Sequence, residues 1–390
     1  MKANCLILTV LIMGCGAQET DQVPEAYRHL ENLTVFPAEK EAPQKINLER
    51  EQSFGDTDET LIGRMGDVTV DDRGRVYIAD NQKKRIFVFE PDGQLIAELG
   101  RGGQGPGEFV ELTAMHATSN ELFVFDRNKQ ESIVFSLASL SYSHTILLAG
   151  NRDEIPELEG ALLNRYYLIR VDNSFLAQFS APNTAAGRRD WDKIENRIHI
   201  YLLDEDGVIG SGKLFDRTSS YQVLVPLGGR TVGMPVSFFG TLLTALSAHD
   251  HLHVAWSEHL LIKRYSPEGE YQDAFYYPIQ RAPLKPESEF PRADRELVNE
   301  AVRSMDLPEK TPALDGMLFD DENRLWVSTV VDNVDVHEWW VLQDSGELIT
   351  RFEWPRDEPV EVVKNGYIYT RQTDEETGLQ QINRYRFEWN

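Results

Sequence analysis

The sequence predicts an all-β fold, a six-bladed β-propeller, and two observations support this prediction. The stretch from Gly66 to Phe109 contains four short β-rich runs separated by turn sequences, which is typical of a four-stranded antiparallel meander. This pattern recurs along the chain, so that six units of roughly 40–60 residues follow one another. One such sheet alone would leave two bare edges, and a closed ring of six sheets removes them.

The first unit shows the pattern most clearly. Its β-rich runs are Val68–Val70, Val76–Ile78, Arg85–Phe89 and Leu95–Leu99. Residues of turn chemistry lie between them, for example Pro91-Asp-Gly-Gln94. The later units are recognised from the runs Asn120–Asp126, Arg165–Ile169, His251–Trp256, Asn323–Thr329 and Gly366–Thr370. In the third unit we expect Arg165–Ile169 to pair with Arg197–Leu203 across an insertion.

Four segments of the first unit carry a family resemblance. They are Arg75-Val-Tyr-Ile-Ala-Asp80, Arg85-Ile-Phe-Val-Phe89, Asp92-Gly and Gly105-Pro-Gly-Glu-Phe109, and they resemble the NHL repeat. The whole chain is similar to NHL-type six-bladed propeller lipoproteins of Bacteroidetes-type bacteria, over most of Ile46–Asn390. The resemblance implies a structural role for Asp80 and Arg85. It implies fold and location more firmly than activity, because propellers include enzymes, scaffolds and ligand binders.

The N-terminus predicts a lipoprotein. Residues 1–14 have the short apolar core of a signal peptide, and Leu11-Ile-Met-Gly-Cys15 resembles a bacterial lipobox. Cys15 would then be lipidated and would be the only cysteine left in the mature chain. Residues 15–44 are polar and predict a tether. Gly16 after the cysteine favours an outer-membrane lipoprotein on the periplasmic or cell-surface side, which contacts the membrane through its acyl chains.

Residues 45–390 are assigned to the propeller, and its ring is predicted to close through its own termini. Lys45–Phe54 alternates like a strand but precedes the first complete unit. The last unit has only three strands before Asn390. Pairing the spare strand with the incomplete unit brings residues near 50 beside residues near 385 and removes the open edge.

The lengths of the connections predict which face is functional. Turns between first and second strands, and between third and fourth strands, are short and lie on one rim. The other rim, here called the long-loop rim, carries the remaining connections. Its long segments are Gly100–Leu112, Gly150–Leu158, Val171–Glu195, Phe215–Val236 and Gln280–Pro312, the last with an amphipathic helix at Arg292–Asp306. Because binding residues concentrate on long loops over rigid scaffolds, we expect ligand contacts there. The candidates are Arg101, Gln104, Asp126, Arg127, Arg170, Glu258, His259, Asp335, His337 and Arg371.

Markers of catalysis are sparse, and no catalytic residue is predicted. Gly100–Gly105 spells a GxGxxG motif, but a strand follows it rather than a helix, so it is interpreted as a blade-to-blade turn. His249, His251 and His253 alternate as metal ligands can, yet His253 occupies a position where other blades have packing aromatics. Asp67, Asp315 and Glu361 near the starts of the innermost strands could hold calcium, the one cofactor left open.

Composition narrows the class of partner. The formal charge is −25, from 64 acidic against 39 basic residues, and no basic stripe is visible. Nucleic acid is therefore excluded as an expected partner. The chain is predicted to be a monomeric module that binds a protein, peptide, glycan or small molecule. Two alternatives stay open: a divalent-metal-dependent lyase or lactonase-type enzyme with its site at the channel mouth, and an accessory protein in glycan or nutrient handling.

Overall fold

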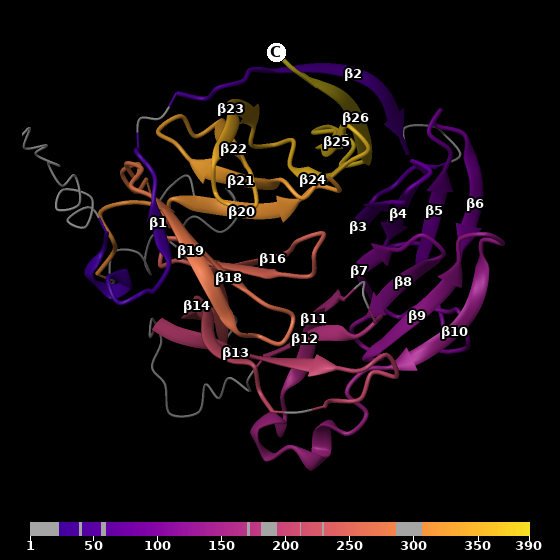
Figure 1. Cartoon of the computed structure of the whole chain (residues 1–390). Coiled ribbons are helices and arrows are strands. Elements are labelled where there is room, and N and C mark those ends of the chain that lie inside the picture. Colours follow the sequence, from indigo (N-terminus) through magenta and orange to yellow (C-terminus); the bar gives the residue numbers. More distant parts are fainter. Residues whose placement is uncertain are drawn as a thin grey trace, which may run out of the picture.

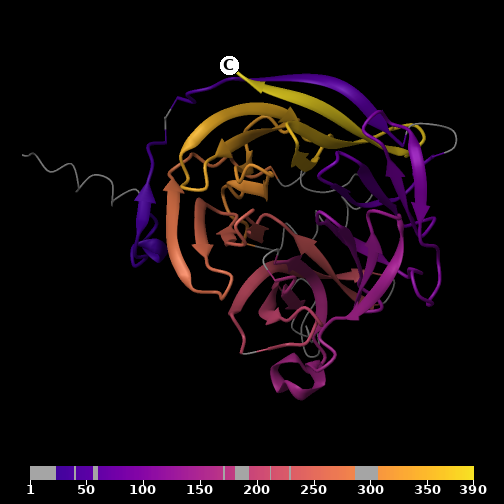
Figure 2. The ribbon, with the colours of Figure 1, turned by 45° about the vertical axis from the view of Figure 1, so that its right-hand side comes forward.

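Six antiparallel sheets are arranged in a ring, and this confirms the predicted six-bladed propeller (Figures 1 and 2). The computed structural model describes residues 23–38, 41–55, 60–169, 172–180, 193–210, 212–227, 230–285 and 306–390. Within these residues, four sheets have four strands and two have five.

Each blade is written from its innermost to its outermost strand. Blade 1 is β3 (Met65–Val70), β4 (Val76–Asp80), β5 (Arg85–Phe89) and β6 (Leu95–Leu99). Blade 2 is β7 (Leu112–Ala117), β8 (Glu121–Asp126), β9 (Glu131–Ser136) and β10 (Ser141–Leu147). Blade 3 is β11 (Leu162–Leu168), β12 (Phe175–Ser180), β13 (Lys193–Leu203), β14 (Phe215–Leu227) and β15 (Arg230–Val236).

The second half of the ring repeats this order. Blade 4 is β16 (Leu242–Leu246), β17 (Leu252–Trp256), β18 (Leu260–Tyr265), β19 (Tyr271–Tyr277) and β1 (Leu33–Val35). Blade 5 is β20 (Leu314–Phe319), β21 (Leu325–Val330), β22 (Val336–Leu342) and β23 (Leu348–Pro355). Blade 6 is β24 (Val360–Lys364), β25 (Tyr367–Thr373), β26 (Gln380–Trp389) and β2 (Ile46–Phe54).

The core lies between neighbouring blades. All five residues of β4 are buried, because the next blade covers one face of the sheet and the preceding blade covers the other. Tyr77 and Ile86 of blade 1 pack with Leu122 and Val124 of blade 2 in one apolar cluster. A strand buried on both faces reads as a continuous apolar run, which is why the second and third strands gave the clearest sequence signal.

The predicted closure of the ring is confirmed. Strand β2 pairs antiparallel with β26, from Ile46 opposite Trp389 to Phe54 opposite Ile382. A side-chain hydrogen bond reinforces this ladder, since the Arg50 guanidinium donates to Asn383 Oδ1 at 2.7 Å. Figure 2 shows this N-terminal strand lying along the outer edge of the C-terminal blade.

A repeated polar motif anchors the turn between first and second strands. In blade 1, the Asp71 carboxylate accepts hydrogen bonds from Arg75 Nε at 2.7 Å and from the Tyr77 hydroxyl at 3.0 Å. In blade 5, Asp320 accepts from Arg324 Nε at 2.6 Å and from Trp326 Nε1 at 2.9 Å. Because charged partners neutralise each buried carboxylate, these turns tolerate full burial.

Blade 4 has a serine where this motif has aspartate. Ser247 Oγ accepts from the backbone amides of the turn. His253 takes the aromatic position, is fully buried, and packs against Phe319 with ring centroids 4.7 Å apart. Its Nε2 lies 3.3 Å from Asp344 of blade 5. This confirms the interpretation of His253 as an inter-blade packing residue.

The prediction of a polar tether is wrong for residues 23–36. Val23 is buried, η2 (Glu25–Tyr27) precedes β1, and β1 pairs in parallel with β19. The apolar residues Leu33 and Val35 cover Leu261 and Tyr276, and this burial together with main-chain pairing to an otherwise free edge fixes the segment. The signal peptide and Cys15 lie outside the described residues.

Two of the predicted long segments contain strands. The insertion Val171–Glu195 contains β12, and Phe215–Val236 is not a loop but the β14–β15 hairpin. Arg165 belongs to β11, the innermost strand of blade 3, and β11 pairs with β12 instead of with Arg197–Leu203 as predicted. The predicted helix Arg292–Asp306 falls outside the described residues except for its last residue.

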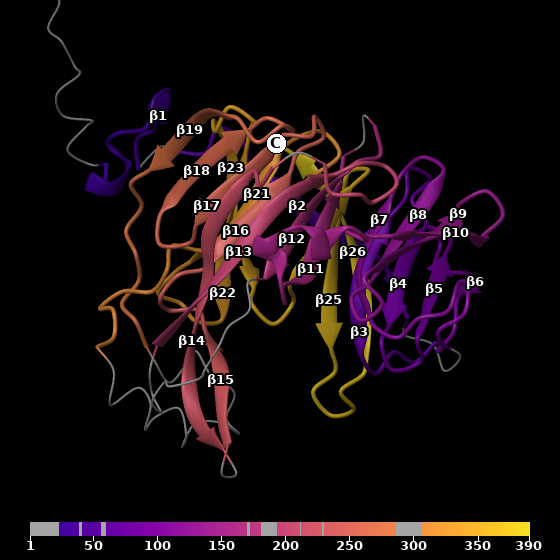
Figure 3. The ribbon, with the colours of Figure 1, turned by 90° about the horizontal axis from the view of Figure 1, so that it is seen from below.

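The division into two rims holds. The β14–β15 hairpin and the β25–β26 hairpin project from the same face of the ring (Figure 3), and both belong to the long-loop rim. Within the described ranges, no helix has the length and apolar character needed to cross a membrane.

Candidate functional site

The innermost strands share a β-bulge near their beginnings. Pairing with the second strand shifts register at this level in blades 1, 2, 3, 5 and 6. The polar residues left out of the pairing are Asp67, Thr113, Asn164, Asp315 and Glu361. They are called the axial ring below. Bulges re-aim side chains and are frequent beside active sites, so this ring on the long-loop rim is the candidate site.

Asp67 is the most perturbed member of the axial ring. Its Oδ2 accepts a hydrogen bond from the backbone amide of Met115 in blade 2, at 2.5 Å. Burial, with a further contribution from the negative charge of Glu361, raises the pKa of Asp67 to about 6. Asp67 is therefore a carboxyl group whose charge changes close to neutral pH.

Glu361 is held by an arginine that also bridges two blades. Arg371 Nε lies 2.8 Å from Glu361 Oε1, and the same guanidinium donates to the carbonyl oxygen of Gly66 at 2.7 Å. Burial raises the pKa of Glu361, and the charge of Arg371 opposes that effect. Arg371, a predicted ligand residue, thus positions the ring by joining blade 6 to blade 1.

Blade 3 brings a positive charge to the same region. The charges of Arg165 and Asp67 interact, although blades 1 and 3 are not neighbours. The Arg165 side chain is exposed to solvent although several blades surround it, as expected for a side chain near the axis of a ring. It donates to the Tyr167 hydroxyl at 3.3 Å, and Tyr167 donates to the Thr244 carbonyl at 3.1 Å. The site therefore combines acids and a base across four blades.

The predicted three-carboxylate calcium set does not form. Asp67, Asp315 and Glu361 do occupy equivalent positions in the axial ring. However, no three histidine, cysteine, aspartate or glutamate side chains among the described residues lie close enough to hold a metal ion. The three carboxylates come from strands on different blades, and each has a separate neighbour: Met115, His337 and Arg371.

Two of the predicted ligand residues contact the axial ring. Arg371 holds Glu361, as described, and the buried His337 has its Nδ1 3.8 Å from Asp315 Oδ2. Burial lowers the pKa of His337. Among the other predicted residues that the structure describes, none forms a hydrogen bond or ion pair with the axial ring.

Asp126 is structural and not a ligand residue. It is fully buried, and its carboxylate accepts from the backbone amides of Val110 at 2.6 Å and Asn128 at 3.1 Å, and from two further amides. Arg127 forms an exposed ion pair with Glu111 at 2.5 Å. Arg170 lies outside the described residues.

Three other predicted residues lie on the second-to-third loops of blades 4 and 5. Glu258 accepts from Trp256 Nε1 at 3.0 Å. His259 packs edge-on against Tyr27, with ring centroids 5.8 Å apart, and burial lowers its pKa. Asp335 is exposed. These residues are accessible on the rim but separate from the axial ring.

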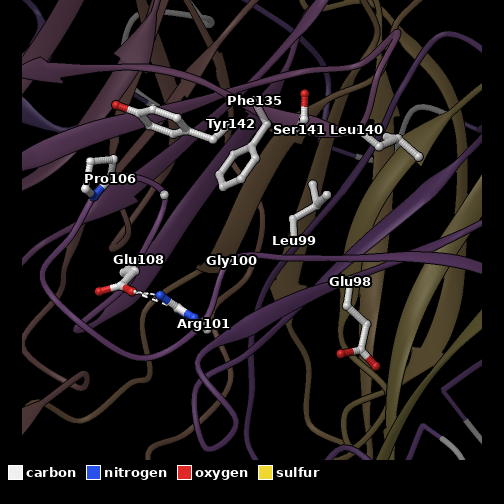
Figure 4. A pocket seen from close by; sticks show the side chains of 11 residues that line it. Glu98, Leu99, Gly100, Arg101, Pro106, Glu108, Phe135, Leu140, Ser141 and Tyr142 are labelled. Carbon is white, nitrogen blue, oxygen red and sulfur yellow. Dashed lines mark hydrogen bonds and ion pairs between the residues drawn. The ribbon is translucent and has the colours of Figure 1, made fainter.

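A pocket of about 310 Å³ lies on the outer wall between blades 1 and 2 (Figure 4). Its lining includes Leu99, Phe135, Leu140 and Tyr142. The predicted ligand residue Arg101 is at this pocket and forms an ion pair with Glu108 at 2.7 Å. Gln104, on the same glycine-rich turn, is exposed.

Four residues of the site were not predicted: Thr113 on β7, and Asn164, Arg165 and Tyr167 on β11. The three on β11 lie in a run that was expected to pair with Arg197–Leu203, whereas it pairs with β12. The alternation of that run gave no sign of its place in the sheet. The apolar run Phe175–Ser180, if recognised as a strand, would have moved β11 to the centre.

Comparisons with known proteins agree with this architecture. A family described as a 6-bladed beta-propeller (DUF5128) matches residues 55–197. A Bacteroides fragilis protein described as exported has 10% identity and a TM-score of 0.50, over 91% of this chain and 99% of its own. A member of the DUF4221 family from Bacteroides vulgatus has 10% identity and a TM-score of 0.51, over 88% of this chain and 99% of its own.

A third solved structure is regucalcin, a calcium-binding protein from Agrobacterium tumefaciens. It has 10% identity and a TM-score of 0.41, over 90% of this chain and 94% of its own. No curated protein matches the chain. At identities this low, similarity to the solved structures indicates the fold only. The chain is a six-bladed β-propeller.

Proposed function

We propose that this chain is a ligand-binding propeller whose ligand sits on the axial ring. The observation that carries the proposal is the recurrence of one bulge, with a polar residue in it, on five inner strands. Each bulge disrupts the hydrogen-bonded ladder locally. A disruption that recurs at one level of the ring is expected where several side chains serve one bound molecule.

The chemistry of the ring favours a ligand with several hydrogen-bond donors. Asp67, Asp315 and Glu361 contribute carboxylates, Asn164 an amide and Thr113 a hydroxyl, while Arg165 adds one strong donor. Hydroxyl groups both donate and accept, so a polyhydroxylated molecule such as a saccharide satisfies this set best. A saccharide ligand agrees with the interpretation of the chain as a binding protein in glycan or nutrient handling.

The N-terminus supports a location outside the cytoplasm at a membrane surface. The apolar segment and lipobox-like residues that end in Cys15 predict lipidation, and Val23 is already packed on the propeller. Seven residues lie between Cys15 and Val23, so the span between them is at most about 28 Å when extended. A lipid-anchored propeller would then lie close to its bilayer, in our proposal the outer membrane.

The test measures saccharide binding by the chain that lacks residues 1–14 and carries Cys15→Ser. Mono- and oligosaccharides are screened by thermal shift, and hits are titrated by calorimetry. Glu361→Gln and Thr113→Val should each weaken binding by roughly 10- to 100-fold, the loss expected for a hydrogen bond to a charged or buried polar group. Asp206→Asn, an exposed change on the opposite rim, is the control and should bind as the parent does.

Two results would contradict this proposal. If the parent and both ring variants bound a saccharide with equal affinity, we would conclude that the ligand does not lie on the axial ring. Binding or turnover that requires added calcium or zinc, with stoichiometric metal in the purified chain, would favour the alternative of a metal-dependent lyase or lactonase-type enzyme.

A further inference from the structure

Three aromatic rings form a box on the long-loop rim, between blades 3 and 4. They belong to Tyr221 on β14, Phe239 after β15, and Trp256 at the end of β17. Tyr221 stands nearly perpendicular to both neighbours, with ring centroids 5.9 Å from Phe239 and 6.1 Å from Trp256. All three side chains are partly exposed. Partly exposed rings set at right angles to one another can offer more than one ring face to a cation.

The box holds the ammonium group of the chain's own Lys193. Lys193 Nζ lies 4.6 Å from the centroid of the Tyr221 ring and 4.2 Å from that of Phe239. Both distances fall within the range of a cation–π interaction. Lys193 is itself exposed at the start of β13, and its flexible four-carbon stem lets the ammonium leave for solvent.

Two carboxylates complete a cation-binding environment. Glu258 accepts a hydrogen bond from Trp256 Nε1 at 3.0 Å, which fixes the indole and brings a negative charge to the box. Burial, followed by the charges of Glu195 and Glu258, raises the pKa of Tyr221, although Glu195 also forms an ion pair with Arg197. Aromatic faces and nearby carboxylates both attract a positive charge, and both repel an anion.

The walls of the box are fixed by packing. Gly240 has φ +90°, and a Cβ at this position would lie 2.7 Å from the Trp256 ring. Phe238 is buried and packs against Phe239, with ring centroids 4.8 Å apart. Val223 and Val236 are buried beside Phe238. The box is therefore preformed, and Lys193 is its movable component.

We propose that this box is a binding site for an alkylammonium group, and that Lys193 is a resident stand-in which the ligand displaces. A quaternary ammonium fits best, because it is a weakly hydrated cation that aromatic cages bind through their ring faces. The ammonium of lysine is strongly hydrated and returns to water readily. The overall charge of −25 favours the approach of such cations. None of the axial-ring residues takes part, so this inference is independent of the proposed function.

The experiment titrates the chain that lacks residues 1–14 and carries Cys15→Ser with tetramethylammonium and choline, by saturation-transfer NMR. Lys193→Ala removes the resident cation and should tighten binding by roughly two- to fivefold, the factor that one exposed cation–π contact supplies. Adding Tyr221→Leu to Lys193→Ala should abolish binding while it retains apolar volume. The uncharged isostere of choline, 3,3-dimethylbutan-1-ol, should not bind.

Lys83→Ala provides a matched control. Lys83 Nζ also lies over one aromatic ring, 5.1 Å from the centroid of Phe87, but no box surrounds it. This variant should leave choline affinity unchanged. A second experiment compares free choline with phosphatidylcholine vesicles, which carry the same quaternary ammonium. Binding to one and not the other shows whether the ligand is a free small molecule or a lipid headgroup.

The proposal fails if the Lys193→Ala chain, with its melting temperature unchanged, shows no saturable binding of either cation. It also fails if the neutral isostere binds as tightly as choline, since the site would then be merely apolar. Equal gains from Lys193→Ala and Lys83→Ala would show an effect of net charge and would also overturn it.

Discussion

Replacing Asp67 with asparagine should make the stability of the propeller less sensitive to pH. Burial and the charge of Glu361 raise the pKa of Asp67 from 3.8 to about 6. An acid whose folded pKa lies above its unfolded pKa stabilises the fold below the unfolded pKa, and this contribution is lost as the pH rises through the folded value. Each pKa unit corresponds to about 1.4 kcal/mol, so two units give about 3 kcal/mol. Because Asp67 is partly exposed, solvent screening reduces the expected effect to about 2 kcal/mol.

The assay is urea unfolding of the parent and of Asp67→Asn, at about pH 4 and about pH 8. From about pH 4 to about pH 8, the unfolding free energy of the parent should fall by about 2 kcal/mol more than that of Asp67→Asn. This double difference cancels any constant effect of asparagine on the hydrogen bond from Met115. Asp206→Asn, an exposed substitution, should show the pH dependence of the parent. Identical pH profiles for the parent and Asp67→Asn would refute the buried, charge-coupled description of Asp67.

Three further predictions concern stability, measured as unfolding free energy in urea. Phe54→Ala removes a fully buried ring from the closing strand and should cost about 3–5 kcal/mol; a cost below about 1 kcal/mol would contradict the closure described. Gly346→Ala should destabilise more than Gly366→Ala, since both have positive φ but only at Gly346 would a Cβ meet an aromatic ring, at 2.4 Å; equal costs would refute this. Asp320→Ala removes the buried counter-charge of Arg324 and leaves it only the exposed Glu322, so it should cost about 3–5 kcal/mol, whereas a neutral result would show that the turn does not depend on this pair.

The features of the fold that the sequence predicts are those set by local chemistry. Alternation and turn residues define the strands of blade 1, and the spare strand before the first unit predicts the closure with β26. The prediction for blade 3 is wrong because β11 and β12 differ from the repeat, and β12 lies within the segment that was expected to be an insertion. The segment containing Leu33 and Val35 was assigned to a tether, since a three-residue strand gains its stability from the edge of β19 and not from its own sequence.

The candidate site was predicted in part for a related reason. Asp67, Asp315 and Glu361 were selected by their positions at the starts of inner strands, and each does occupy a bulge. A bulge is a property of register between two strands, so one strand's sequence does not reveal it. Asp126 was misassigned although Asp80 at the equivalent position of blade 1 was judged structural, and both accept backbone amide hydrogen bonds. The NHL-type resemblance and the lipid anchor stay predictions.

The pairing of β2 with β26 has a consequence for how the molecule is made. Arg50 and Asn383, which bond across this ladder, are 333 residues apart. Strand β2 therefore has no partner until synthesis reaches β26, and contacts of such long range form slowly. Blade 6 can be completed only after β26 has been synthesised. A ring that stays open until then can still pass through a secretion channel as an unfolded chain, which suits the export proposed here.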